Sequence, residues 1–490
     1  MKLENLSATE LGTLVNTKKI SPVEVIDYFE ERIKLRNPSI NAFTYTRFDE
    51  ARQRARELEN DIMKGNELGP LAGVPVALKD FLPSKKGWTA SHGGVKSLIT
   101  VDEEDSMFCK SAESQGAIVV GKTNAPSFGF RGLTDNYMYG PTSTPFKIGY
   151  NSGGSSGGSC AAVADGLVYI AETGDLGGSG RIPAAWCGTF GFKPSAGLVP
   201  NVCRPDGWTA THPYCGGAGT ARTVKDAALI MNLMQEYDPR DPLSVPLSPM
   251  QFDEFTWIKG MKIGVTYNFD LFPQPDPEIV QAIDECVSVL REAGAQVDYV
   301  KFDPINYPRS VVELSWLLGG SVDTAIEMEL WKKEGYDLEK DHKDEVPEQF
   351  LVANRMVKEC NILDYRKFHD IRTSILDSQL SVFKDYQLVI APVAGCLPVK
   401  NADKWGETVG PDKIDGEDVN NIIGFGYTYL QNMTGYPAAS VPFKLSKEGL
   451  PIGIQVVGRR YRDSDVFDVA HAIEEIHPWR DLYKIAYNRM

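Results

Sequence analysis

Apolar positions divide the chain into segments of helical and strand-like pattern. They recur at helical spacing over residues 8–34 and 48–64, and Ser21 before Pro22 is typical of a helix start. After Pro70 the pattern changes to short apolar runs at 73–81 and 116–121, which suit buried strands, with a helix expected over 106–115. This alternation predicts an α/β fold, a sheet with helices on both faces.

The same alternation continues to the end of the chain. The pattern predicts helices over 223–234, 276–293 and 463–476, and strands over 261–267, 296–300, 386–392 and 451–457. Residues 309–385 are mostly helical in pattern and richly charged. No linker divides the chain, which favours one domain.

Composition narrows the range of partners. The 490 residues are 42% hydrophobic and 24% charged, with a formal net charge of -15 and a pI near 5.0. An acidic surface argues against nucleic acid or an anionic membrane as partner. The first residues lack the apolar core of a signal peptide, and no apolar run is long enough to span a bilayer. With eight scattered cysteines and no C-x-x-C pair, the sequence predicts a cytoplasmic protein with reduced thiols.

Two turns rich in glycine and serine are the candidates for chemistry. The first, GGSSGGS from Gly153, is followed at once by the apolar CAAVADGLVYIA, which argues against a flexible linker. A helix over 158–164 and a strand over 167–171 lead to the second turn, DLGGSG at 175–180. Neither turn has the lysine of a phosphate loop. This layout can bring Ser155 and Ser179 close together.

A nucleophilic serine needs a base, and Lys79 is the candidate. None of the six histidines lies in a suggestive setting. Lys79 ends an apolar strand, where burial would lower its pKa and free the amine to accept a proton. The alternative is a structural lysine paired with Asp80. On residue chemistry alone, both interpretations stay open.

Taken together, these residues resemble the amidase signature family of serine hydrolases. The resemblance rests on GGSSGGSCAAVADGLVYIAETGDLGGSGRIPAAWCGTFGFKPSAG over 153–197. Further matching pieces are GVPVALKD, GKTNAPSFGF, NYMYGPTSTPF, GTARTVKDAALIM and GYPAASVPF, all in the family's order. The likeness covers nearly the whole chain and is weakest between 305 and 385. It implies one domain over 1–490 with a central mixed sheet, in which 1–65 are an N-terminal helical segment, 66–205 the catalytic core and 305–385 a variable substrate region.

The resemblance also implies a role for each residue of the site. Ser179 aligns with the nucleophile, Ser155 with a bridging serine that follows a cis peptide bond, and Lys79 with the base. The family's oxyanion hole aligns with the backbone amides of Leu176, Gly177, Gly178 and Ser179. Ser156, Asp175 and Arg181 align with residues that hold the turns. No metal or cofactor is implied. Gly180 stands where the family has a bulky apolar residue.

The expected substrate is a small, apolar or aromatic amide. Five aromatic residues are candidates for its pocket, although residues of this kind are more often core residues than ligand contacts: Phe128, Phe130, Trp316, Phe425 and Tyr427. The second half of the chain looks most like secondary-amide hydrolases, such as 6-aminohexanoate-cyclic-dimer hydrolase or the aryl and acyl amidases. A carbamate or ester hydrolase, the glutaminase subunit of a tRNA-dependent amidotransferase, and a non-enzymatic binding protein stay as alternatives. The family implies a possible homodimer.

Overall fold

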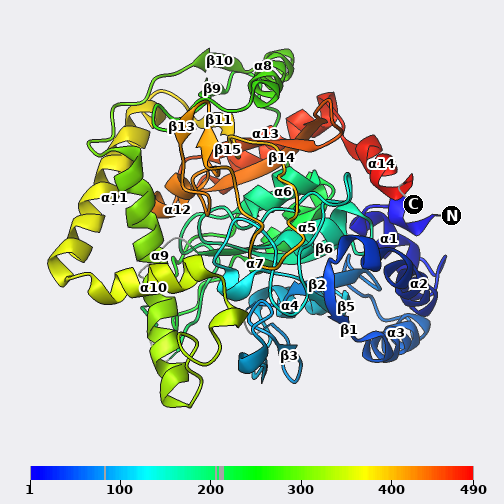
Figure 1. Cartoon of the computed structure of the whole chain (residues 1–490). Coiled ribbons are helices and arrows are strands. Elements are labelled where there is room, and N and C mark those ends of the chain that lie inside the picture. Colours follow the sequence, from blue (N-terminus) through cyan, green and yellow to red (C-terminus); the bar gives the residue numbers. More distant parts are fainter. Residues whose placement is uncertain (1, 82–83, 205–206, 209–214, 489–490) are drawn as a thin grey trace.

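A mixed β-sheet runs through the middle of the computed structural model, which describes residues 2–81, 84–204, 207–208 and 215–488 (Figure 1). Within these residues the sheet has 11 strands. In spatial order they are β1 (Phe43–Thr46), β5 (Ile118–Thr123), β2 (Pro75–Lys79), β6 (Ile170–Asp175), β8 (Gly216–Ala221), β7 (Phe190–Lys193), β14 (Ala438–Leu445), β15 (Pro451–Gly458), β11 (Leu388–Pro392), β9 (Lys262–Val265) and β10 (Gln296–Tyr299).

Parallel pairing is confined to the two sides of this sheet. Strands β5, β2 and β6 are parallel neighbours on one side, and β11, β9 and β10 on the other. Between them β6, β8, β7, β14, β15 and β11 pair antiparallel, and β1 closes one edge antiparallel to β5. Two short hairpin pairs lie outside it, β3 (Thr89–Ala90) with β4 (Thr100–Val101) and β12 (Lys413–Ile414) with β13 (Glu417–Asp418). The expected α/β architecture with a mixed sheet is therefore confirmed.

Helices cover both faces of the sheet. They are α1 (Ala8–Asn16), α2 (Pro22–Ile40), α3 (Phe48–Met63), α4 (Met107–Ser114), α5 (Gly157–Ala164), α6 (Arg181–Cys187), α7 (Val224–Met234), α8 (Pro277–Glu292), α9 (Arg309–Lys333), α10 (Glu348–Glu359), α11 (Ile362–Phe383), α12 (Tyr429–Thr434), α13 (Asp463–Ile476) and α14 (Tyr483–Asn488). Helices α4, α7, α13 and α8 contact one another in a row, while α5 and α6 pack together against the sheet.

The helical pattern over 8–34 corresponds to two helices, in agreement with the helix start predicted at Ser21. Helix α1 ends at Asn16, the backbone at Lys18 turns to a φ of 59°, and α2 continues to Ile40, past the predicted end. Helix α2 then starts afresh, with the Ser21 hydroxyl accepting a hydrogen bond from the N–H of Val23 at 3.0 Å. The other predicted helices and strands are present within a few residues.

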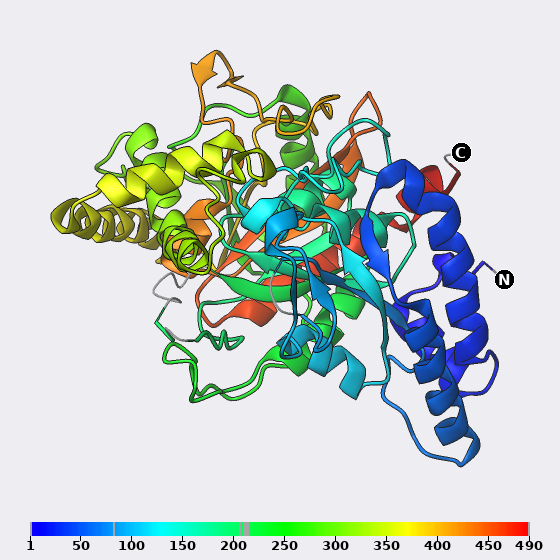
Figure 2. The same ribbon diagram turned by 60° about the horizontal axis from the view of Figure 1, so that its bottom comes forward.

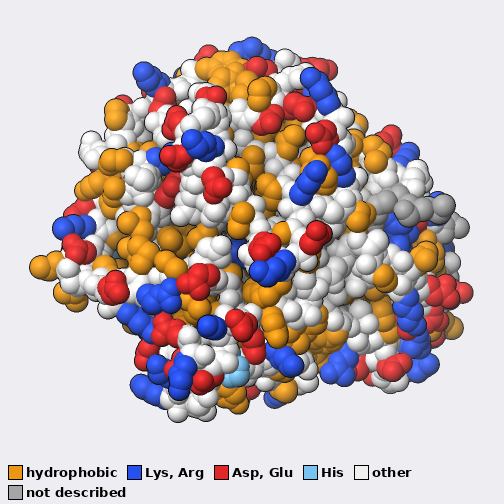
Figure 3. All heavy atoms as spheres, in the orientation of Figure 1, with side chains coloured by type: hydrophobic (Ala, Val, Ile, Leu, Met, Phe, Trp, Pro, Cys, Tyr) orange, Lys and Arg blue, Asp and Glu red, His pale blue; other side chains and the backbone are white. Residues whose placement is uncertain are grey.

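Helices α9 to α11 and helices α1 to α3 lie at opposite ends of the molecule (Figure 2). Figure 3 shows charged side chains of both signs scattered over one face, with apolar ones gathered on its left, where α9 to α11 lie in Figure 1. No helix in the described ranges is both long and apolar enough to cross a membrane. All eight cysteines are unpaired, and four of them are buried.

Candidate active site

The ends of β2 and β6 bring the predicted residues to one edge of the sheet. The two strands are parallel neighbours that pair Ala77 with Ala171. Parallel strands end at the same edge, the usual place for a site in an α/β sheet. Lys79, the last residue of β2, therefore lies close to the turn that follows Asp175, the last residue of β6.

Lys79 is buried and makes its side-chain hydrogen bond to a serine. Its Nζ lies 2.7 Å from the Oγ of Ser155. Its side chain is 5% exposed, and the ring of Phe81 lies 5.2 Å from Nζ. Burial lowers the pKa of the Lys79 ammonium group to about 8. About a tenth of the Lys79 population therefore holds a neutral amine at pH 7, and about half does at pH 8.

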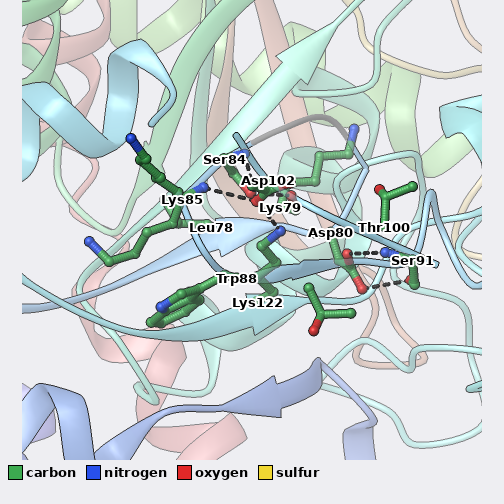
Figure 4. A network of polar contacts seen from close by, with 12 residues as sticks. Leu78, Lys79, Asp80, Ser84, Lys85, Trp88, Ser91, Thr100, Asp102 and Lys122 are labelled. Carbon is green, nitrogen blue, oxygen red and sulfur yellow. Dashed lines mark hydrogen bonds and ion pairs between the residues drawn. The ribbon is translucent and has the colours of Figure 1, made fainter. Parts of the chain in front are cut away.

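A second buried lysine, Lys122 on the neighbouring strand β5, has the ion pair expected of a structural lysine and serves as a comparison for Lys79. Its Nζ lies 2.5 Å from the carboxylate of Asp102, and both side chains are buried. Lys122 pairs with Leu78 in the sheet, so its side chain and that of Lys79 leave on opposite faces (Figure 4). The alternative pairing of Lys79 with Asp80 is not what the structure contains, because Asp80 accepts hydrogen bonds from Ser91 instead.

Ser155 lies on a tightly packed turn before α5. The peptide bond between Gly154 and Ser155 is cis. A Cβ atom on Gly158 would come within 2.4 Å of the backbone nitrogen of Asn124, so only glycine fits there. The N–H of Ser156 donates to the carbonyl of Ser179 at 3.1 Å, which joins this turn to the second one. The stretch is a packed turn and not a linker.

The turn that carries Ser179 is fixed by its own carboxylate. The carboxylate of Asp175 accepts from the N–H of Gly178 at 2.8 Å and from the N–H of Gly180 at 3.3 Å. The Arg181 guanidinium binds both oxygens of the same carboxylate at 2.9 Å. Although burial alone would raise the pKa of Asp175, Arg181 and Asn432 hold it at about 2. Asp175 is thus an anion that organises the turn.

Two consecutive carbonyl groups of this turn, those of Gly177 and Gly178, have defined partners. Thr428 donates its hydroxyl to the carbonyl of Gly177 at 2.6 Å, and Ile182 donates its N–H to the carbonyl of Gly178 at 2.7 Å. Because a trans peptide points its N–H opposite to its carbonyl, the N–H of Ser179 points away from α6. Within the described residues, no partner is found for the N–H groups of Leu176, Gly177 and Ser179.

The five aromatic pocket candidates occupy different places. Phe130 is partly exposed and meets Phe350 edge-on at 5.3 Å, while Phe128 is buried and stacks on the same ring at 4.9 Å. Trp316 lies against Gly177, since a Cβ there would come within 2.2 Å of the indole. Its neighbours therefore include the turn that carries Ser179.

The remaining two candidates have the contacts of core residues. Phe425 and Tyr427 are both 0% exposed. Phe425 stacks on Trp186 at 5.6 Å. The hydroxyl of Tyr427 donates to the carbonyl of Pro273 at 2.8 Å. Packing on other side chains and the hydrogen bond to Pro273 account for both residues as part of the core.

Sequence reasoning missed Thr428 and the partners of Arg181. The guanidinium of Arg181 also donates to Asn432 at 2.6 Å and to Gln455 at 2.7 Å. These residues lie about 250 or more positions along the chain from the turn they hold. Phe81, whose ring lies beside Lys79, was also missed as a site residue, although it ends the predicted strand. No local pattern marks Thr428, Asn432 or Gln455 as part of a site.

Comparisons with known proteins identify the family of this chain. A family model described as Amidase matches residues 24–467. The chain belongs to the amidase family. Amide hydrolysis is the activity that this membership supports.

Individual relatives are similar over almost their whole length. An acylamidase of Rhodococcus erythropolis is 30% identical over 486 residues, covering 97% of this chain and 96% of the relative. A glutamyl-tRNA(Gln) amidotransferase subunit of Alkaliphilus metalliredigens is 29% identical over 501 residues, covering 97% of each. The solved structure of a bacterial aryl acylamidase of the amidase signature family superposes with a TM-score of 0.95, at 38% identity and 99% coverage of both chains.

Proposed function

We propose that this amidase cleaves small aryl amides through an acyl-enzyme formed on Ser179. The observation that carries the proposal is the 2.7 Å contact between Lys79 Nζ and Ser155 Oγ at a buried lysine whose pKa is lowered to about 8. A neutral amine that accepts a proton from a serine is what a Ser-Ser-Lys relay needs. The turn of Ser155 is hydrogen-bonded to Ser179 itself.

Acylation would follow from this arrangement. The Lys79 amine takes the proton of Ser155, whose oxygen takes the proton of Ser179. The Ser179 oxygen then bonds to the substrate carbonyl carbon, and the carbonyl electron pair moves onto oxygen. When the tetrahedral intermediate collapses, the proton returns through Ser155 to the nitrogen, the C–N bond breaks and the amine leaves. Water attacks the acyl carbon by the same relay and releases the carboxylic acid and Ser179.

The oxyanion would be held by backbone amides of the turn after Asp175. The resemblance to the family implies four amides there, 176 to 179. The N–H of Gly178 already donates to Asp175, so we assign the contact to Leu176, Gly177 and Ser179, with Gly178 holding their geometry. Each such donor is typically worth about 3 kcal/mol in the transition state.

An aryl amide is the substrate class best supported. Partly exposed Phe81 and Phe130 lie near Ser155, where flat rings favour an aromatic group. The similarity to an aryl acylamidase and to an acylamidase supports the same class. The similarity to an amidotransferase subunit makes glutamine the substrate that must be tested against it.

The test is amine release from a panel of substrates. Acetanilide, the cyclic dimer of 6-aminohexanoate, an aryl carbamate, an aryl ester and glutamine would be compared for the wild type, Ser179→Ala and the surface control Ser288→Ala. We expect acetanilide to be best and its turnover to be lost only in Ser179→Ala. Full activity of Ser179→Ala would refute the nucleophile, and preferential glutamine turnover would refute the substrate class.

A further inference from the structure

The two sides of the proposed site have different walls. On the Ser155 side, a Cβ on Gly129 would lie 3.2 Å from Ser155 Oγ and 3.1 Å from the ring of Phe81. Phe130, next in the chain, is partly exposed and packs among the same aromatic side chains. This wall is therefore made of flat aromatic rings close to the bridging serine.

The other wall is built by α9 against the turn after Asp175. A Cβ on Gly177 would lie 2.2 Å from Cζ2 of Trp316, so the indole rests directly on the turn. Gly320 lies one helical turn further along α9, next to the partly exposed side chain of Leu176. A Cβ added to Gly320 would lie 3.7 Å from Cδ2 of Leu176. Tyr429 backs the indole, with the ring centres 6.0 Å apart.

The geometry of the reaction determines whether the amine or the acyl group of the substrate lies against the aromatic wall or the α9 wall. The leaving nitrogen must come within hydrogen-bond reach of Ser155, because that hydroxyl returns the proton. The carbonyl oxygen must face the amides of the 176–179 turn. The remaining substituent of the carbonyl carbon, the acyl chain, then points away from Ser155. Leu176 and Trp316 are the side chains that lie against the turn there.

We propose that Trp316 sets the length of the acyl group, so that the enzyme takes short-chain acyl amides of aromatic amines. This inference rests on the proposed function and adds to it an upper limit on the length of the acyl chain. A buried indole occupies a large volume, and a few carbons of acyl chain would have to displace it. Trp316 would thus exclude long acyl chains by filling their space.

Trp316 is also a residue that can be truncated without disrupting a polar network. Its Nε1 is buried and has no hydrogen-bond partner in the part of the chain that the structure describes. Replacing it by leucine therefore removes ring volume and leaves no partner unpaired. Trp331, on the same helix, offers a matched control, because it packs against His92 and Tyr336 rather than on the turn.

The experiment compares kcat/KM for the 4-nitroanilides of acetate, butyrate and octanoate. We expect the wild type and Trp331→Leu to prefer acetyl over octanoyl by at least about 30-fold. Trp316→Leu should reduce that preference at least about 10-fold by accepting octanoyl. The preference of Trp316→Leu for acetanilide over N-methylacetamide should stay that of the wild type, because the leaving-group wall is unchanged.

The outcomes separate this inference from the proposed function. An active wild type with no acyl preference, or a Trp316→Leu variant that loses all substrates equally while its melting temperature is unchanged, would overturn the role of Trp316 alone. A wild type that hydrolyses no anilide, and whose Ser179 does not react with a fluorophosphonate, would overturn the proposed function instead.

Discussion

In the two serine turns the buried side-chain polar groups have protein partners, whereas along α9 several side-chain groups have no hydrogen-bond partner among the described residues. Asp175, Arg181 and Ser156 all bind neighbouring groups of the turns. On α9, by contrast, one or more buried polar atoms lack a hydrogen-bond partner among the described residues in each of these residues: Arg309, Glu313, Trp316 and Ser321. Buried polar groups are normally paired. The side chains of the serine turns are therefore already hydrogen-bonded, whereas α9 carries polar atoms that could still bind a substrate or water.

This difference has a functional meaning. The hydrogen-bonded side chains of the turns form a rigid network, which suits the backbone amides that must hold a transition state within a fraction of an ångström. The α9 wall packs on that network through Trp316 and Gly320, and no hydrogen bond joins the two among the residues that the structure describes. Changes in the turns should therefore alter the rate for every substrate, and changes along α9 should alter the choice among substrates.

The largest effect is expected from Lys79→Met. Removing the amine should lower kcat by about 10³- to 10⁴-fold for all substrates, as loss of a triad member does. In the wild type, kcat/KM should rise about tenfold per pH unit up to about 8 and then level off, because only neutral Lys79 accepts the proton. A pH profile of acetanilide hydrolysis measures both.

Lys122→Met is the matched control for Lys79→Met. It removes a buried lysine whose partner is a carboxylate, so Asp102 is left as an unpaired buried charge, at a cost of about 3–5 kcal/mol of unfolding free energy. Lys79→Met leaves only a serine hydroxyl behind, and its melting temperature should not fall. If the two variants behaved alike, the distinction between a catalytic and a structural lysine would be wrong.

The next effect is expected from Asp175→Asn. The neutral amide cannot balance Arg181 and replaces an acceptor oxygen used by the turn, so we expect kcat to fall about 100-fold. Denaturant unfolding should show a loss of about 3 kcal/mol or more. Glu313→Gln, which changes a carboxylate on α9, should lose less than about 1 kcal/mol and keep kcat. Equal losses in both variants would contradict the comparison.

A smaller effect is expected from Thr428→Val, which removes the hydroxyl that binds Gly177 and keeps the side-chain shape. The Gly177 carbonyl would be left without its buried donor and its peptide freer to rotate. We expect kcat to fall about tenfold with KM changed less than about threefold. Thr428→Ser, which keeps the hydroxyl, should restore most of kcat. Failure of serine to rescue would show that only packing matters here.

The catalytic elements could be predicted because their signals are local. The apolar run ending in Lys79 became β2, and the order of turn, helix, strand, turn and helix around Ser155 and Ser179 is as expected. Strand β8 was missed, because its sequence GGAGTA has no apolar alternation. It forms only because β6 and β7 pair with it on both sides, which is tertiary information.

The walls could not be predicted in the same way. Trp316 and Tyr427 are both aromatic residues in plausible regions, and the sequence offers no means of ranking them. Packing separates them, since the Tyr427 hydroxyl binds Pro273 while Trp316 lies on Gly177. Thr428 shows no motif, because its role depends on a turn some 250 residues away. The structure therefore adds the contacts between distant segments, which sequence patterns do not contain.

The smallest effect is expected from Phe350→Leu on α10. Phe350 stacks on Phe128 at 4.9 Å and meets Phe130 at 5.3 Å, so it supports the aromatic wall from behind without approaching the serines. A leucine keeps much of the volume but not the flat ring. We expect KM for acetanilide to rise about threefold, with kcat and the position of the pH profile unchanged.

Steady-state kinetics on acetanilide and on an aliphatic amide would check this. The aliphatic KM should stay within about twofold of the wild type, because only an aromatic leaving group uses the wall. A fall in kcat comparable to that of Thr428→Val would mean that α10 is coupled to the catalytic turns. The separation between a core that sets the rate and a helical region that selects the substrate would then be wrong.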